Sequence, residues 1–403
     1  MRISNAQIFE HGVAAMMKKQ AQLHETEMQL TSGLRIMKPS DDPSGAVKIL
    51  NLDANIEVLD QYQRNTAVAE SSLAYEESVL VSVNDSIQRI RELTVQGNNA
   101  TNSNEDRASI ATEIYSRLDE LLALANTRDA NGEYIFGGNR VNLPPFVDSN
   151  GVVSYVGDQG ERSIQIGEST QVVIRDSGED IFQSIQTGDG IIEVQADAGN
   201  TGTAVLSGFG LNGTFVRDTY TVTFNQATAA DPVTYTVTDS TLPVPNVVTT
   251  GTYSDGASIT FAGAQFQLDG QPDDGDVVVL APSRKQDVFA SIKAIADALD
   301  SPSFNEADTA IFHNRMAEGL ANLDQVLDSV NNIRGKIGAR LNNVDALNNI
   351  NDDFKLQLET VLSETRDLDY AEAISRFNLQ LTSLQAAQQA FIRASGLSLF
   401  QYL

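Results

Sequence analysis

Near the start of the chain, apolar residues recur every three, four or seven positions, the spacing that places side chains on one side of an α-helix. The pattern predicts a helix with one apolar stripe, formed by Phe9, Val13, Met16, Leu23, Leu30 and Leu34. We expect this helix to end near Lys38, because Pro39 disfavours helical geometry in the residue before it. Asp42 and Pro43 then suit the N-cap and the first position of a second helix. The segment that contains Pro39, Asp41, Asp42 and Pro43 is therefore predicted to be an inter-helix loop.

The second predicted helix repeats its apolar positions at a strict seven-residue step, as coiled-coil helices do. One seam position is occupied by Leu52, Leu59, Thr66, Leu73, Leu80 and Ile87. Much of the other seam position is occupied by Tyr62, Ala69, Val83 and Ile90. The pattern stops at Gly97-Asn98-Asn99, and a third helix is predicted over about residues 104–126.

The middle of the chain, residues 141–282, alternates apolar and polar residues with a period of two. This alternation predicts an antiparallel β domain with one face of each strand in a core. Within it, Gly208-Phe209-Gly210-Leu211-Asn212-Gly213 formally matches a dinucleotide-binding fingerprint, but a strand follows it instead of a helix. We interpret that segment as a turn. Asp273-Asp274-Gly275-Asp276 lacks the closing glutamate of a calcium loop and is also predicted to be a turn.

Helical spacing returns after Pro302 and predicts the longest helix of the chain, with apolar positions from Leu320 through Phe354 to Leu368. A final apolar stripe follows, formed by Ile374, Phe377, Leu381, Leu384 and Phe391, and the predicted polymerisation interface also includes Leu399 and Phe400 beyond Gly396. A single stripe on a terminal helix is buried only when another helix covers it. We therefore expect both terminal stripes to pack on the opposite terminus and on other subunits.

These elements predict an α+β multidomain protein, in which long-helix coiled-coil or bundle domains at both ends enclose an inserted antiparallel β domain. The predicted domains are residues 1–43 with 366–403 as a helical polymerisation domain, 44–140 with 283–365 as a rod-like bundle, and 141–282 as an acidic outer domain.

Charge and composition exclude several functions. The 403 residues carry a formal net charge of -27, which argues against nucleic acid and anionic membranes as partners. The β region accounts for much of this charge, with 18 acidic residues, three arginines and no lysine. The chain has no cysteine and no apolar run long enough to span a bilayer, and its start lacks the features of a cleavable signal peptide.

No set of residues with catalytic or metal-binding spacing is present in the sequence. The three histidines, His11, His24 and His313, lack the spacing of a helical zinc site. Nucleophile elbows and phosphate-binding Gly-Lys-Ser/Thr loops are absent as well. We therefore predict a structural protein without enzymatic activity, cofactor or metal.

Short motifs in both flanks give the chain a recognisable family character. They are Arg2-Ile3-Ser4-Asn5, Leu30-Thr31-Ser32-Gly33-Leu34-Arg35-Ile36, Pro39-Ser40-Asp41-Asp42-Pro43, Gly132-Glu133-Tyr134-Ile135-Phe136-Gly137-Gly138 and Leu397-Ser398-Leu399-Phe400-Gln401-Tyr402-Leu403. With these motifs the chain resembles members of the flagellin superfamily. The proline after the Asp-Asp pair and the Leu-Phe-Gln-Tyr-Leu ending are more similar to the junction branch of that superfamily than to filament subunits.

The resemblance implies a structural junction protein of the bacterial flagellum, needed for motility, that polymerises between a layer of hook-associated protein 1 and the flagellin filament. The partners it implies are other copies of the chain in a ring or helical layer, hook-associated protein 1, flagellin, and an export chaperone at the C-terminal helix. It also implies export without a cleavable signal through the flagellar type III channel, and an extracellular location. Burial of the terminal stripes in such a ring would stabilise each apolar residue by roughly 1.5–3 kcal/mol.

Two other functions stay open. The chain could be a flagellin filament subunit, which differs from a junction protein in copy number. The acidic β domain could instead be an adhesin-like binding module on a helical stalk, which surface aromatics clustered on one β face would favour.

Overall fold

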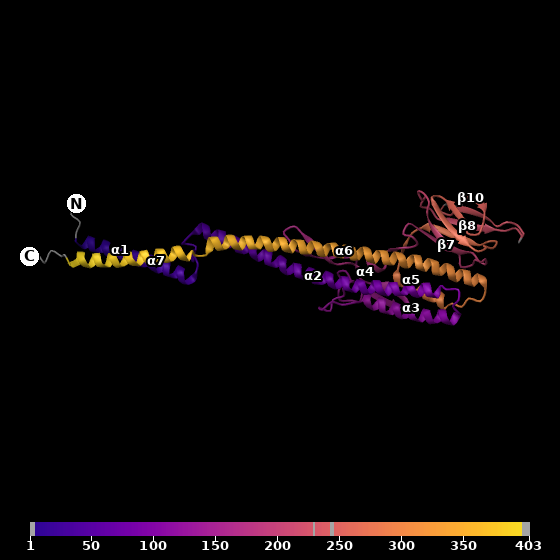
Figure 1. Cartoon of the computed structure of the whole chain (residues 1–403), viewed down its shortest axis with the longest axis horizontal. Coiled ribbons are helices and arrows are strands. Elements are labelled where there is room, and N and C mark those ends of the chain that lie inside the picture. The colour runs from indigo at the N-terminus through magenta and orange to yellow at the C-terminus, as the bar shows by residue number, and fades with distance from the viewer. Residues whose placement is uncertain (1–4, 229, 242–245, 397–403) are drawn as a thin grey trace, which may run out of the picture. The chain divides into compact units, whose positions relative to one another are not determined.

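The computed structural model describes residues 5–228, 230–241 and 246–396, and in this part of the chain seven helices flank and interrupt a β region (Figure 1). The helices are α1 (Asn5–Ser32), α2 (Pro43–Gly97), α3 (Asn104–Ala125), α4 (Gly178–Phe182), α5 (Val288–Asp300), α6 (Glu306–Arg366) and α7 (Tyr370–Gly396). The strands are β1 (Phe146–Ser149), β2 (Val152–Tyr155), β3 (Arg162–Gln165), β4 (Gln171–Arg175), β5 (Ile185–Gln186), β6 (Ile192–Ala196), β7 (Val205–Leu211), β8 (Tyr220–Asn225), β9 (Thr234–Asp239), β10 (Asn246–Thr252), β11 (Ser258–Phe261), β12 (Ala264–Asp269), β13 (Val277–Pro282) and β14 (Lys285–Gln286). The predicted fold class, terminal helices with an inserted antiparallel β region, is confirmed.

The chain divides into two compact units, and the long helices α2 and α6 run through both of them. Unit 1 comprises residues 1–66 and 346–403, and unit 2 comprises residues 67–345. Unit 1 is helical in its described residues, whereas unit 2 also holds the β region. The three predicted domains stay a prediction.

In unit 1 the terminal helices α1 and α7 pack against each other in antiparallel directions. The first helix ends at Ser32, so the prediction of an end near Lys38 is wrong by six residues. Gly33 adopts a φ of 72°, a left-handed conformation that ends a helix and that favours glycine. Leu34 then forms a bridge with Asp367, and the residues that follow it up to Asp42 are not helical.

The heptad seam predicted for α2 is confirmed by its burial. Leu52, Leu59, Thr66, Ala69, Leu73, Leu80, Val83, Ile87 and Ile90 are all buried, and Tyr62 is half-buried. Apolar positions of α6 at the same seven-residue spacing are buried too, namely Leu323, Val330, Ile337 and Val344. Phe354 was also predicted to be an apolar position of this helix, but unlike the others its side chain is half exposed. Ion pairs flank the seam in both units, including Lys355–Asp60 in unit 1 and Arg334–Glu77 in unit 2. The seven-residue repeat thus identified the buried face of α2.

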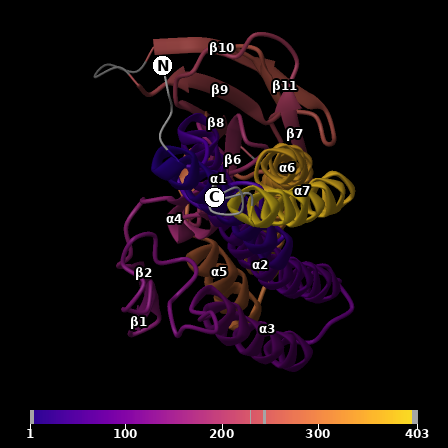
Figure 2. The same cartoon turned by 90° about the vertical axis from the view of Figure 1, so that its left-hand side faces the viewer.

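The helix predicted at about residues 104–126 is observed as α3, which begins with a capping box at Ser103 and Asp106. Helix α3 lies along α5. The sheet that contains β8, β9 and β10 lies on one side of α6, and α3 lies on the other side (Figure 2). A cluster of aromatic rings holds this part of unit 2 together, since Phe146 contacts Phe182 and Phe289, and Phe182 contacts Phe136.

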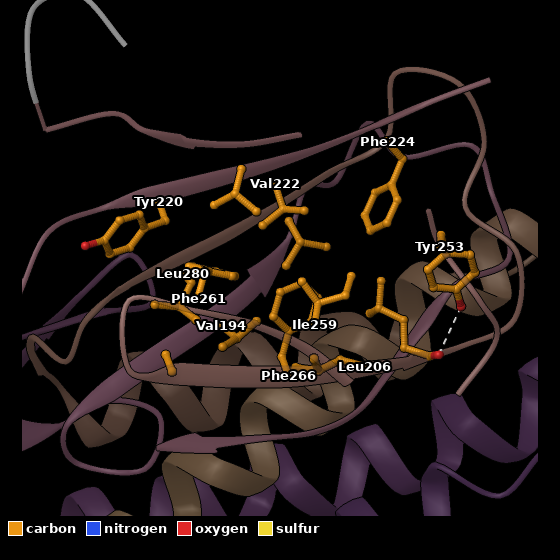
Figure 3. Close-up of a cluster of buried hydrophobic side chains, with 14 of the residues drawn as sticks. Val194, Leu206, Tyr220, Val222, Phe224, Tyr253, Ile259, Phe261, Phe266 and Leu280 are labelled. Atoms are coloured by element: carbon orange, nitrogen blue, oxygen red, sulfur yellow. Dashed lines mark hydrogen bonds between the residues drawn. The ribbon is translucent and has the colours of Figure 1, made fainter. Parts of the chain in front are cut away.

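Two sheets of the β region form a sandwich in unit 2. One sheet has the strand order β10-β9-β8-β13-β6 and the other β11-β12-β7, and their strand pairs are all antiparallel. The inward side chains of both sheets meet in one apolar core, which contains Val222, Phe224, Leu280, Ile259 and Phe266 (Figure 3). Alternating burial along β8 and β12 confirms the predicted period of two.

Turn chemistry explains several strand connections. Asn150 and Gly151, with φ values of 59° and 77°, join β1 to β2 in the two-residue loop that this residue pair favours. The turn predicted at residues 273–276 is confirmed, and the buried Asp276 carboxylate accepts backbone N–H groups of Thr201, Gly202 and Asp273. The turn predicted at Gly208–Gly213 is wrong for most of its length, because residues 208–211 belong to strand β7 and pair with β12.

Candidate assembly interface

The seam between α1 and α7 combines apolar and polar contacts. At one end the rings of Phe9 and Phe391 lie with their centroids 5.0 Å apart. Gly12 lies under Phe391, since a Cβ atom at that position would come within 2.9 Å of the ring. Further along, the Thr26 hydroxyl donates a hydrogen bond of 2.8 Å to Oε1 of Gln380. The two termini thus partner each other, as the sequence had predicted.

Most residues of the predicted interface line this seam or its margin, but they are not fully covered by it. Half-buried residues are Val13, Met16, Leu23, Leu30, Leu34, Phe377, Leu381 and Phe391. Leu384 is buried, whereas Phe9 and Ile374 are 54% and 50% exposed. Leu399 and Phe400 lie outside the described residues. The intramolecular pair therefore leaves much of the predicted surface available to further helices.

Other apolar side chains on the same two helices are more exposed, and the periodicity argument missed them. Met17 is 67% exposed, Leu379 73% and Ile392 68%. Ile374 and Ile392 are 18 residues apart, which is five helical turns, so they lie on one side of α7. Leu379 lies about 140° around the helix axis from Ile374, so α7 presents apolar groups in two directions. Leu379 lies off the main stripe of α7, which is why a search for one stripe did not find it.

The inter-helix loop is bonded to the start of α7 and the end of α6. The Arg35 backbone N–H donates to the Arg366 carbonyl at 2.7 Å, and the Leu368 N–H donates to the Gly33 carbonyl at 2.9 Å. The Arg35 guanidinium also donates to the Thr365 carbonyl through Nη2, at 2.7 Å. These bonds join residues more than 300 positions apart in sequence, and they lie where α1 ends and α7 begins.

Both aspartates of the predicted loop act on backbone N–H groups. Oδ2 of Asp41 accepts hydrogen bonds from the N–H groups of Met37 and Lys38. Oδ1 of Asp42 accepts the N–H of Gly45 at 3.0 Å, which confirms Asp42 as the N-cap of α2, with Pro43 as its first residue. The hydrogen bond from Gly45 lowers the pKa of the Asp42 carboxyl. Pro39 is exposed in the same loop.

A buried group of charged residues in unit 2 was not foreseen from the sequence. Glu76 on α2 is 1% exposed, and its Oε1 accepts the backbone N–H of Asp176 at 3.0 Å. Its Oε2 is buried without a hydrogen-bond partner among the described residues. Burial, reinforced by the nearby Asp176 carboxylate, raises the pKa of Glu76 to about 8. Glu76 is therefore mostly protonated at neutral pH.

Arg340 on α6 completes this group by donating to both carboxylate oxygens of Asp176 at 2.8 Å each. The neighbouring Arg175 is paired with Asp129 and Glu133. The group connects α2, α6 and the entry to α4, three segments that are distant in sequence. No group of three or more side chains that could hold a metal ion occurs within residues 5–228, 230–241 and 246–396.

None of the helices in the described part of the chain has the length and apolar character to cross a membrane.

Comparison with known proteins agrees with this architecture. The model of the bacterial flagellin N-terminal helical region matches residues 3–140, and that of the bacterial flagellin C-terminal helical region matches residues 320–403. Relatives extend the match across the β region. Flagellar hook-associated protein 3 of Escherichia coli strain K12 is 27% identical over 402 residues, which cover 100% of this chain and 99% of that protein.

Solved structures give the same result. The crystal structure of FlgL from Xanthomonas campestris is 32% identical with a TM-score of 0.71, over 77% of this chain and 99% of that one. The chain belongs to the flagellin family. The flagellar junction protein FlgL from Legionella pneumophila is 26% identical, also with a TM-score of 0.71, over 80% of this chain and 100% of that one. The present chain is therefore a structural protein of the flagellum and not an enzyme.

Proposed function

We propose that this protein is the hook-filament junction protein of a bacterial flagellum, which polymerises as a layer between hook-associated protein 1 and the flagellin filament. The observation that carries the proposal is the similarity to hook-associated protein 3 over the whole chain, β region included. Flagellin of Escherichia coli strain K12, by contrast, matches 30% of this chain. This difference in coverage favours a junction protein over a filament subunit.

Assembly proceeds through the terminal helices in this proposal. The α1–α7 pair leaves Met17, Leu379 and Ile392 more than 60% exposed, an unfavourable arrangement for large apolar side chains in water. Neighbouring subunits would cover them together with the half-buried stripe residues. The export chaperone would cover the C-terminal helix before secretion, and the mature protein would be extracellular.

The adhesin-like alternative receives no support from the β region. Its aromatic residues Tyr220, Phe224, Tyr253, Phe261 and Phe266 face the sandwich core. Among the described residues 141–282, the large exposed hydrophobic side chains are aliphatic. The described part of the β region therefore offers no cluster of surface aromatics that could stack on a ligand such as a glycan.

The junction role is tested by deleting the gene and imaging the cells. We expect hooks without filaments, with flagellin in the medium, and retained filaments would refute the proposal. Complementation then tests the interface: Leu379→Asp should give stable protein but no filaments, because a charge at an apolar contact opposes assembly. Gln389→Asp, at an exposed polar position of the same helix, adds the same charge and should restore filaments.

A further inference from the structure

Unit 2 contains a groove that is lined by apolar and cationic side chains. It has a volume of about 780 Å³ and lies between one side of α2, the loop after α3 and the β3–β4 hairpin. We call it the α2 groove and define it by Val68, Ser71, Tyr75, Arg128, Arg162 and Ile174. Val68 is 54% exposed and Tyr75 39%, so apolar surface in the groove faces solvent.

The groove is cationic in a chain whose net charge is -27. Three arginines and two acids line it, and Glu133 pairs with both Arg162 and Arg175. Arg128 is exposed and has no carboxylate partner among the described residues. Its guanidinium donates a hydrogen bond of 2.7 Å to the Tyr134 hydroxyl and lies over the Tyr134 ring. The groove thus offers an apolar floor and a free positive charge.

A complementary feature lies where α5 connects to α6. Phe304 is 82% exposed, and its backbone N–H donates to Oδ2 of Asp308, which fixes the turn. Glu306 is exposed beside it. Asn104 at the start of α3 bonds the backbone of Ser303, which brings the acidic first turn of α3 to the same place. We call this feature the Phe304 tip.

The tip cannot fill the groove of its own chain. Continuous helix α2 runs from the groove at Ser71 to Gly97, and the following residue Asn98 bonds His313 near the start of α6. At 1.5 Å per residue the two features are about 40 Å apart. They lie at different places on one unit, so a contact between them joins two copies head to tail.

We propose that the Phe304 tip of one copy inserts into the α2 groove of a second copy. Phe304 would cover Val68 and Tyr75, and the acids of the tip would face Arg128. The contact is heterologous, because one copy contributes its Phe304 tip and the other its α2 groove. The first copy therefore still has a free groove, and the second still has a free tip. The inference deepens the proposed assembly function by naming a contact in unit 2 that is separate from the terminal helices.

The cysteine-free chain allows a direct test by disulfide trapping in the full-length protein. Ser303→Cys, which keeps Phe304, is mixed with Ser71→Cys under oxidising conditions, and heterodimer is quantified on non-reducing gels. Ser82→Cys is the matched control, since Ser82 is an exposed serine of α2 outside the groove. We expect at least tenfold more heterodimer with Ser71→Cys than with Ser82→Cys.

Two further variants establish what drives the contact. Phe304→Ser added to Ser303→Cys, or Arg128→Glu added to Ser71→Cys, should lower the yield about tenfold, and high salt should lower it as well. Equal yields at Ser71 and Ser82, or a yield that Phe304→Ser leaves unchanged, would overturn the inference. That outcome in a protein that still supports filament growth would leave the junction role intact. Conversely, filaments in the deletion strain would refute the junction role, whereas the disulfide-trapped contact between two copies would still stand.

Discussion

Glu76 should make the stability of unit 2 depend on pH in a way that a single substitution removes. Its folded-state pKa of about 8 lies above the ordinary value of 4.5, because the charged carboxylate is unfavourable in a buried site. The folded state therefore binds this proton more tightly than the unfolded state. The resulting stabilisation is complete below pH 4.5 and is lost as the pH rises through about 8.

The magnitude follows from the shift in pKa. Each unit is equivalent to about 1.4 kcal/mol, so the free energy of unfolding should fall by on the order of 5 kcal/mol between pH 4.5 and pH 8 because of Glu76 alone. The pKa of about 8 already includes the opposing effect of the nearby Arg340 and Arg175 guanidinium groups. Above pH 8 the contribution of Glu76 to the pH dependence should level off.

The perturbation is Glu76→Gln, which keeps the shape of the side chain and removes its titration. The amide can still accept the Asp176 N–H, but its NH₂ group would occupy a site where Oε2 has no partner, at a cost of about 1–3 kcal/mol that does not vary with pH. The slope of stability against pH is therefore the useful readout, and the absolute stability is not.

Hydrogen exchange of the buried α2 peptides, followed by mass spectrometry from pH 5 to pH 9 and corrected for intrinsic rates, would report opening of this part of unit 2. We expect the wild-type opening free energy to fall with pH and that of Glu76→Gln to change much less. Asp287 and Glu318, whose pKa values are also raised by burial, titrate in both proteins and cancel in the comparison. Identical slopes for the two proteins would refute the reasoning.

Three other substitutions test separate parts of the fold. Arg340→Ala removes both hydrogen bonds to Asp176 and should cost about 3 kcal/mol, measured as a lower urea midpoint, because a buried carboxylate loses its cation; an unchanged midpoint would contradict this. Leu73→Ala opens a cavity at a fully buried seam position and should lower stability by about 2–5 kcal/mol in the same assay, whereas Ala74→Ser on the exposed side should not. Gly33→Ala introduces a side chain at a φ of 72° and places its Cβ 2.9 Å from the Tyr370 hydroxyl, so faster hydrogen exchange is expected at the α1–loop junction.

Periodicity and local chemistry were sufficient to predict much of this protein. The seven-residue repeat from Leu52 to Ile87 identified the buried face of α2, because a helix turns by a fixed angle per residue and the buried positions must recur with it. Asp42 and Pro43 marked the start of α2, since an N-cap depends on atoms within a few residues. The terminal motifs were sufficient to indicate the flagellin family, which the full-length comparisons confirm.

The tertiary structure decided what depends on contacts between distant residues. The first helix ends at Ser32 and not near Lys38, because Gly33 and Leu34 bond the segment around Asp367. The α1–α7 seam determines which terminal apolar residues stay exposed, and it singles out Leu379, which lies off the main stripe. Glu76 and Asp176 are 100 residues apart and carry no local signal of contact, so only the folded chain reveals their shared burial. A sequence specifies the faces of its helices locally, whereas the partner of each face is determined by packing along the whole chain.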